Sequence, residues 1–172
     1  MTRARFLGGI RDIAAADWNA LAGRDYPFLR HEFLCALEDS GSVGGDSGWE
    51  PHHLLLHEGS RLVGALPCYL KQHSYGEYVF DWSWADAYRR HGQHYYPKLL
   101  SAVPFTPAAG PRLLLAEGVA FADLENELLA TVGEEMARRG ASSWHLLFPE
   151  QPVAEELAVA GLGHRTGVQF HW

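Results

Sequence analysis

The chain has 172 residues, of which 47% are hydrophobic and 20% charged, and its formal net charge is -7 at pH 7. These values are typical of one globular domain and exclude an intrinsically disordered chain. The acidic balance, with only two lysines, argues against a nucleic-acid-binding surface, so we expect no DNA partner.

The hydrophobic pattern predicts short strands alternating with helices. In chain order, we expect a strand at 5–10, helices at 14–21 and 27–39, a β-hairpin at 52–71, a strand at 112–115, a helix at 121–139, a strand at 143–148, a helix at 153–160 and a strand at 165–172. The helix at 121–139 has the strongest signal, because apolar residues recur every four positions and Gly140 follows as a C-cap. This order predicts an α/β domain in which helices flank both faces of a mixed sheet.

The cysteines and the N-terminal segment indicate a cytoplasmic protein. Cys35 and Cys68 are the only thiols, and they form neither a CxxC motif nor a disulfide framework, which fits a reducing compartment. The N-terminus lacks the apolar core of a signal peptide, and no stretch approaches the roughly 18 apolar residues of a membrane span. We therefore expect a cytoplasmic location and no membrane span.

The segment HSYGEYVFDWSWADAY at 73–88 is rich in aromatic residues and carboxylates. If residues 75–84 are extended, alternate side chains share a face. One face is then apolar, and three of its residues are expected in the core: Phe80, Trp82 and Trp84. Glu77 and Asp81 lie on the other face, about 13 Å apart, which excludes the carboxylate pair of a glycosidase. A short helix at 85–91 follows.

Polar residues around this segment are candidates for a site. Buried tyrosine hydroxyls need partners, so four tyrosines are expected to line a semi-polar site: Tyr75, Tyr88, Tyr95 and Tyr96. His73 lies in KQHSYGE, where it could be a general base or an oxyanion donor, or part of a solvated loop. Asp81 must be paired or functional inside an aromatic run, and Arg112 could pair with it or hold an anionic ligand group.

Metal and phosphate motifs are missing from the sequence. The histidines form no HExxH motif and no His/Cys cluster, so we expect no metal. Neither GxxxxGK[ST] nor GxGxxG occurs, and no glycine-rich pyrophosphate loop of the acetyl-coenzyme A type is evident.

Several segments resemble one bacterial family. They are PFLRHEFLCALEDSGSVG at 27–44, GWEPHHLLL at 48–56, a nearly continuous run at 62–114, SSWHLLFP at 142–149 and QFHW at 169–172. Together they closely resemble the FemAB-like predicted N-acyltransferases, which are described as peptidoglycan biosynthesis or recognition proteins. The resemblance covers nearly the whole chain.

The resemblance implies a fold, an architecture and an activity. The fold is similar to that of Gcn5-related N-acetyltransferases: an α/β (α+β) domain with a mixed, mostly antiparallel sheet and helices on both faces. Residues 1–172 would be the first of two copies. The apolar end QFHW also suggests a cut chain, because termini normally trail off as polar tails.

The implied activity is transfer of an acyl or aminoacyl group to an amine of a peptidoglycan-type or peptide acceptor. Acyl-coenzyme A and aminoacyl-tRNA are the possible donors, and a peptidoglycan precursor or small molecule is the expected substrate. Whether one copy is active alone stays open. The alternatives are a non-catalytic peptide- or glycan-binding half-domain, and a domain that associates with itself or with a second acyltransferase-like domain.

The resemblance also marks a candidate cleft. Acyl transfer to an amine needs a base and donors for the oxyanion, and the carrier must be held. The catalytic candidates are Asp81, Glu77 and His73. The substrate-binding candidates are Lys71, Ser74, Tyr75, Trp82, Tyr95, Tyr96, Lys98 and Arg112. Glu77 or Asp81 would be the base, His73 or the Tyr75 hydroxyl would donate to the oxyanion or leaving group, and Lys98 with Arg112 would anchor phosphate or carboxylate.

Overall fold

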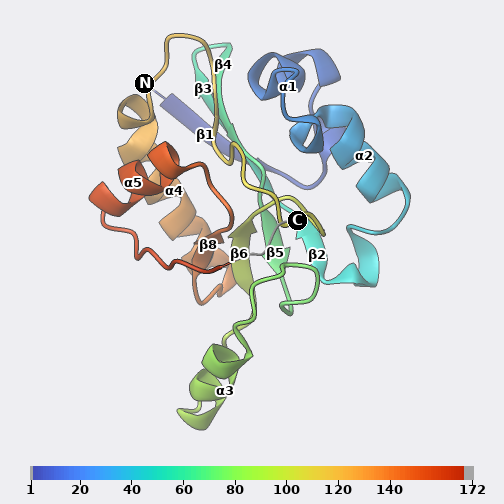
Figure 1. The fold of residues 1–172 in the computed structure, drawn as a ribbon. Helices are drawn as coiled ribbons and strands as arrows, with labels where there is room; N and C mark the ends of the chain where they lie inside the picture. The colour runs from blue at the N-terminus through green and yellow to red at the C-terminus, as the bar shows by residue number, and fades with distance from the viewer. Residues whose placement is uncertain (1, 169–172) are drawn as a thin grey trace.

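A computed structural model describes residues 2–168 and contains two four-stranded sheets (Figure 1). The first sheet has the order β1 (Thr2–Leu7), β3 (His53–Glu58), β4 (Arg61–Leu66) and β7 (Leu114–Leu115), with all neighbours antiparallel. The second has the order β2 (Trp49–Pro51), β5 (Tyr69–Lys71), β6 (Lys98–Ser101) and β8 (Trp144–Leu146). In the second sheet only the described pair β6/β8 is parallel.

A bent β-hairpin joins the two sheets. The chain passes from β2 to β3 at His52 and returns from β4 to β5 at Pro67 and Cys68. The backbone N–H of His52 donates to the Cys68 carbonyl at 2.8 Å, and the Cys68 N–H donates to Nδ1 of His53 at 3.2 Å. An imidazole thus replaces a carbonyl acceptor at the bend, so buried backbone groups stay paired where the sheets diverge.

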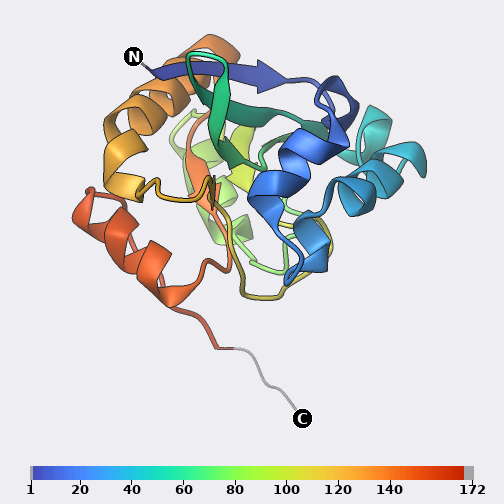
Figure 2. The same ribbon diagram turned by 90° about the horizontal axis from the view of Figure 1, so that it is seen from above.

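Helices cover both faces of the first sheet (Figure 2). Leu54 and Leu56 belong to a core with α4 (Phe121–Arg139) and α5 (Gln151–Val159), whereas Leu55 belongs to a core with α1 (Ala15–Ala22) and α2 (His31–Asp39). Successive strand residues point to opposite faces, so one Leu run serves both layers. The α4 helix has the predicted bounds and ends at Gly140, which adopts a left-handed conformation (φ 65°).

The structure confirms the predicted fold class, α+β with helices on both faces, but the strand predicted at 75–84 is wrong. Residues 75–81 form a loop that leads into α3 (Trp82–Arg90). The loop bends because Gly76 and Tyr78 have φ of 79° and 59°, and the ring of Phe105 lies where a Cβ on Gly76 would be. The strand predicted at 165–172 is absent from residues 165–168, and residues 169–172 lie outside the described residues.

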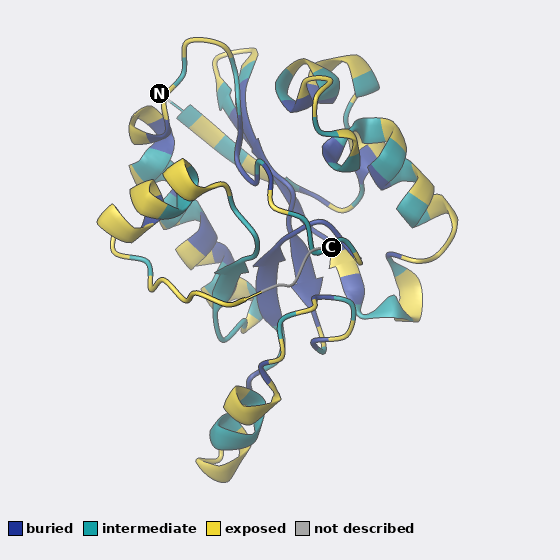
Figure 3. Cartoon of the chain, in the orientation of Figure 1, coloured by how far each residue is buried: buried dark blue, intermediate teal, exposed yellow. Residues whose placement is uncertain are grey.

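The α3 helix projects away from the body of the domain (Figure 1). All nine of its residues are described and none is buried (Figure 3). The predicted core residues Phe80, Trp82 and Trp84 are in fact 67%, 58% and 55% exposed, so that prediction is wrong. Within residues 2–168, no helix combines the length and apolar character needed to cross a membrane.

Candidate functional site

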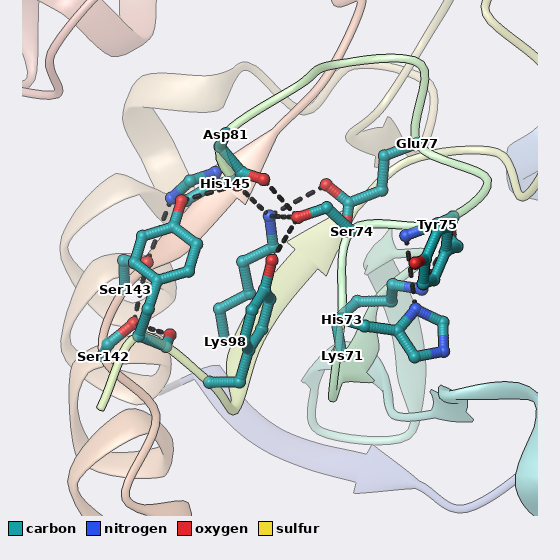
Figure 4. A network of polar contacts seen from close by, with 12 residues as sticks. Lys71, His73, Ser74, Tyr75, Glu77, Asp81, Lys98, Ser142, Ser143 and His145 are labelled. Atoms are coloured by element: carbon teal, nitrogen blue, oxygen red, sulfur yellow. Dashed lines mark hydrogen bonds and ion pairs between the residues drawn. The ribbon is translucent and has the colours of Figure 1, made fainter. Parts of the chain in front are cut away.

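A buried group of charged and hydroxyl side chains lies between β6 and the loop that precedes α3 (Figure 4). At its centre Lys98 Nζ donates to Glu77 Oε2 at 2.8 Å and to Asp81 Oδ2 at 2.5 Å. Lys98, Asp81 and Glu77 are 0%, 2% and 3% exposed. We call the set of six residues around Lys98 the buried cluster: Ser74, Glu77, Asp81, Tyr95, Tyr96 and Lys98. One ammonium group thus holds two carboxylates away from water.

Asp81 is fully engaged within the cluster. Its Oδ2 accepts from Lys98 and from the Tyr95 hydroxyl at 2.5 Å, and its Oδ1 accepts from the Ser74 hydroxyl, which also contacts Tyr96 OH. Desolvation acts to raise the Asp81 pKa, but the hydrogen bonds from Lys98, Ser74 and Tyr95 outweigh it and lower the pKa. Asp81 is therefore an ionised, saturated acceptor.

Glu77 differs from Asp81 because one of its carboxylate oxygens has no hydrogen-bond donor among the described residues. Oε1 is buried and has no hydrogen-bond partner among residues 2–168. Desolvation raises the Glu77 pKa, although the charge of Lys98 and its hydrogen bond oppose the shift. A buried carboxylate oxygen without a donor is costly, so this atom is suited to take a proton or a donor from a ligand.

Lys71 lies directly opposite Lys98 across the β5/β6 pair, which places both side chains on one face. Its Nζ lies 3.8 Å from the centre of the Trp49 ring and donates to the Tyr75 carbonyl at 3.1 Å. Desolvation lowers the Lys71 pKa to about 7; repulsion by Lys98 adds to this shift and the nearby carboxylates oppose it. Lys71 is thus a buried amine that can lose its proton near neutral pH.

His145 on β8 is a nearby residue that the sequence did not single out. Its Nε2 lies 3.0 Å from the Ser143 hydroxyl, and its ring packs edge-on to Tyr95. Desolvation, with repulsion by Lys98, lowers its pKa to about 4, so the imidazole is neutral at pH 7. In the sequence, His145 stood out only as part of SSWHLLFP, one of the segments that resemble the family. Its position beside Tyr95 follows from the parallel β6/β8 pairing.

The structure brings seven of the predicted site residues together: Lys71, Ser74, Glu77, Asp81, Tyr95, Tyr96 and Lys98. Both carboxylates contact the same Lys98 nitrogen, so the predicted separation of about 13 Å between Glu77 and Asp81, based on an extended strand, is wrong. The loop curls around Lys98 and brings their charged ends together.

Four other predicted residues lie apart from the buried cluster. The Arg112 guanidinium is buried and donates to the carbonyls of Leu147, Ala108 and Pro111, so the suggested pairing of Arg112 with Asp81 is wrong. The remaining three are His73, whose Nδ1 accepts from the Tyr75 N–H, and the exposed side chains of Tyr75 and Trp82.

A surface hollow of about 500 Å³ adjoins the buried cluster. Its lining comprises Ala85, Asp86, Arg89, Gly92, Gln93, His94, Tyr95 and Tyr96. We call it the tyrosine hollow, because Tyr95 and Tyr96 line it while their hydroxyls bond to Asp81 and Ser74. A molecule in the hollow would therefore be separated from Asp81 and Ser74 by one tyrosine ring. Within the described chain, no group of three or more His, Cys, Asp or Glu residues is placed to hold a metal ion.

The family to which the chain belongs follows from a comparison with known protein families. The model of the FemAB-like family, described as peptidoglycan biosynthesis/recognition, matches residues 9–172. The chain belongs to this family. No curated protein sequence matches the FemAB-like chain at a significant level.

Solved acetyltransferases share the fold of this FemAB-like domain. Aminoglycoside N-acetyltransferase AAC(6')-Iy in complex with CoA is 11% identical, with a TM-score of 0.60 over 100% of this chain and 94% of that chain. A ribosomal-protein-alanine N-acetyltransferase from Brucella melitensis is 12% identical, with a TM-score of 0.55 over 100% and 97% of the two chains. A GCN5-related N-acetyltransferase from Ralstonia eutropha is 15% identical, with a TM-score of 0.54 over 100% and 99%. These matches confirm the predicted Gcn5-related N-acetyltransferase fold.

The presence of CoA in one relative raises the question of whether this chain could bind the same group. A pyrophosphate is favoured by basic side chains and free N–H groups at a helix N-terminus. At the N-terminus of α4, the longest described helix, the Ala120 N–H is bound by Asp123 Oδ2 at 2.9 Å, and Glu117 and Glu125 add negative charge in the sequence around it. This end of α4 therefore does not fit a pyrophosphate.

Proposed function

We propose that this FemAB-like domain transfers an acyl or aminoacyl group to an amine of a peptidoglycan-type or peptide acceptor. Membership of the family and the acetyltransferase fold support an acyl-transfer role. The observation that carries the assignment of roles is the open, buried Oε1 of Glu77 beside Lys98. Amine acceptors are protonated near neutral pH, and acyl transfer begins with removal of that proton.

Glu77 is the proposed general base. Its raised pKa brings it closer to that of an ammonium than the lowered pKa of Asp81, and its open oxygen can receive the proton. The acceptor R–NH₃⁺ gives up one proton, which the Glu77 carboxylate receives through the polar contacts that end at Lys98 and Oε2, and the freed amine attacks the acyl carbonyl carbon. The nitrogen of the resulting tetrahedral centre then loses its second proton to the departing carrier, the bond between the carbonyl carbon and the carrier breaks, and an amide and the protonated carrier remain. Asp81 holds Lys98 and the hydroxyl groups in position.

The acceptor is proposed to bind in the tyrosine hollow. Tyr95 and Tyr96 line it, and the contact from Tyr96 OH through the Ser74 hydroxyl leads to Lys98, whose Nζ lies 3.5 Å from Ser74 Oγ. This chain of polar atoms offers a route for a proton between the hollow and Glu77. Trp82 is proposed to extend the aromatic wall at the surface.

Three further roles remain proposals. His73 and the exposed Tyr75 hydroxyl are the proposed donors to the oxyanion or leaving group; the two rings pack edge-on, and the Tyr75 backbone carbonyl accepts from Lys71. Lys71 is proposed to contact the donor through its nearly neutral amine. The three described carbonyl contacts of Arg112 support a role in holding the 104–111 loop more than one as an anion anchor.

Glu77→Gln tests the proposed base. The chain is mixed with a muropeptide carrying a free side-chain amine and with either acetyl-CoA or aminoacyl-tRNA, and the amide product is measured by mass spectrometry. We expect turnover to fall by about 10²–10⁴-fold in the variant. In the wild type, the rate should rise with pH through the raised Glu77 pKa, because the carboxylate is the active form.

The matched control is Glu134→Gln, the same chemical change at an exposed position of α4. It should keep wild-type turnover. Wild-type turnover in a folded Glu77→Gln variant would remove Glu77 from the mechanism. A wild-type chain that forms no amide with either donor would contradict the activity itself.

The second candidate is a non-catalytic module that binds a peptide or glycan. It is favoured by the saturation of Asp81, whose described contacts leave no free oxygen, and by exposed tyrosine and tryptophan side chains, which suit sugar or peptide contacts. Calorimetric titration separates the two candidates. Binding of a muropeptide without binding of either donor favours the module, whereas binding of both favours the transferase.

A further inference from the structure

Arg89 gives the tyrosine hollow a positively charged wall. It is the one arginine or lysine among the described residues that line the hollow. Asp86, which also lines it, pairs with Arg89 through Oδ1 and with Arg90 through Oδ2, so arginines already hold both of its oxygens. Two arginines against one carboxylate leave α3 with an excess of one positive charge. In a chain whose net charge is -7, this excess indicates a place for an anionic group.

The Arg89 guanidinium keeps free hydrogen-bond donors. Among residues 2–168 its one side-chain hydrogen bond runs from Nη2 to Asp86 Oδ1, so Nε and Nη1 donate to no described group. The Arg89 side chain is 79% exposed, and an ion pair this exposed contributes little to stability, so Asp86 competes only weakly with a ligand. The planar fork of a guanidinium matches the two oxygens of a carboxylate. Arg89 is therefore suited to bind a carboxylate in the hollow.

The direction of α3 determines which anion fits the hollow. Residues 92–96 of the lining directly follow His91, the C-cap of α3, so the hollow lies at the C-terminal end of this helix. A helix C-terminus carries partial negative charge, whereas phosphate sites use helix N-termini or several cations. Asp86 adds a full negative charge to the lining. A singly charged, planar carboxylate fits these surroundings better than a phosphate.

We propose that Arg89 binds a carboxylate of the acceptor, an inference that rests on the proposed function, and thereby selects amine acceptors that also carry a free carboxyl group. The hollow of about 500 Å³ lies within the range of small-ligand sites. With its carboxylate at Arg89, the acceptor lies along Tyr95 and Tyr96, which belong to the buried cluster. Arg89 is thus a specificity-determining residue that takes no part in making or breaking bonds.

Arg89 and Arg90 also share a simpler role, which is to stabilise the last turn of α3. Cations near a helix C-terminus interact favourably with its dipole, and both arginines pair with Asp86 one turn earlier. The two residues differ in one respect: Arg89 lines the tyrosine hollow and Arg90 does not. A comparison of variants at these two positions therefore separates recognition of a ligand from stability of the helix.

Calorimetric titration tests the selection with one muropeptide in two forms. Both forms carry a free side-chain amine, but the peptide carboxyl groups are free in one form and all converted to carboxamides in the other. We expect the wild type to bind the free form about 10–100-fold more tightly, because the amide loses the charge-assisted pair with Arg89. Arg89→Gln should bind both forms equally. Arg89→Lys should keep part of the preference, because it keeps the charge but not the planar fork.

Arg90→Gln is the matched control, because it makes the same chemical change in the same helical turn and removes an ion pair with the same Asp86. This variant should keep the wild-type preference for the free form. In turnover with the free form, Arg89→Gln should raise KM with little change in kcat, as expected of a residue that only binds the acceptor. Both arginines are exposed, so both variants should keep the far-UV circular dichroism spectrum of the wild type.

The outcomes separate this inference from the proposed function. Equal binding of the two forms by the wild type would overturn the carboxylate assignment and leave acyl transfer to an amine standing. A preference that survives in Arg89→Gln, or that disappears in Arg90→Gln, would do the same. A wild type that binds neither form would contradict the peptidoglycan-type acceptor of the proposed function, and this inference with it.

Discussion

The buried cluster and the exposed aromatic side chains of residues 75–84 come from the same stretch of chain, yet they reverse the usual positions of polar and apolar side chains. Glu77 and Asp81 are buried around Lys98, whereas Phe80 and Trp82, the neighbours of Asp81 in sequence, are exposed. Burying charges is costly unless they are paired, and exposing large aromatic surfaces is unusual for an isolated domain. Both features are therefore expected to serve contacts with other molecules rather than stability alone.

The largest expected effect is a loss of stability when Lys98 of the buried cluster is replaced. Lys98→Met removes the ammonium between two buried carboxylates, so we expect the free energy of unfolding to fall by about 3–5 kcal/mol. Urea denaturation followed by circular dichroism measures it. The triple variant Lys98→Met/Glu77→Gln/Asp81→Asn should recover most of the loss, because no buried charge is left unpaired. A change of less than ~1 kcal/mol in the single variant would show that the cluster is hydrated rather than buried.

An intermediate, pH-dependent effect is expected at Lys71. Its folded-state pKa of about 7 lies below its unfolded value, so between pH 7 and about 10 the unfolded chain binds more protons and this group adds stability as pH rises. Lys71→Met avoids the burial of a charge, so it should gain stability over the wild type at pH 6, with the difference shrinking towards pH 9. Urea denaturation at several pH values measures this. A difference that is independent of pH would contradict the lowered pKa.

The smallest effect is expected at Trp84 on α3. Trp84→Ser should change the free energy of unfolding by less than about 0.5 kcal/mol in urea denaturation, because the exposed side chain contributes little to the core. A loss of more than ~2 kcal/mol would show that Trp84 packs in the core and would contradict the contrast between the two regions.

Local sequence patterns predicted most of the elements but failed where distant contacts decide the conformation. The helix at 121–139 was predicted with its bounds, because apolar periodicity and a C-terminal glycine are local signals. The strand at 75–84 was wrong because Phe105, far along the chain, packs on Gly76 while Tyr78 takes a left-handed conformation. Alternation of side chains could not predict that bend.

The sequence predicted which residues form the candidate site, but it did not predict how they are arranged. Polar residues clustered near a strand end, together with the family resemblance, were enough to select Glu77, Asp81 and Lys98. Their pairing follows from the curl of the loop over β6. His145 was missed because it reaches Tyr95 only through the parallel pairing of β8 with β6.

The most direct test of the account is a carboxyl-carbon NMR titration of the two acids in the buried cluster. The claim is that Glu77 is desolvated with one open oxygen, whereas Asp81 is saturated with donors. The Glu77 carboxyl should titrate above the usual glutamate range and the Asp81 carboxyl below the usual aspartate range. A Glu77 carboxyl that titrates at or below its ordinary pKa would contradict the account.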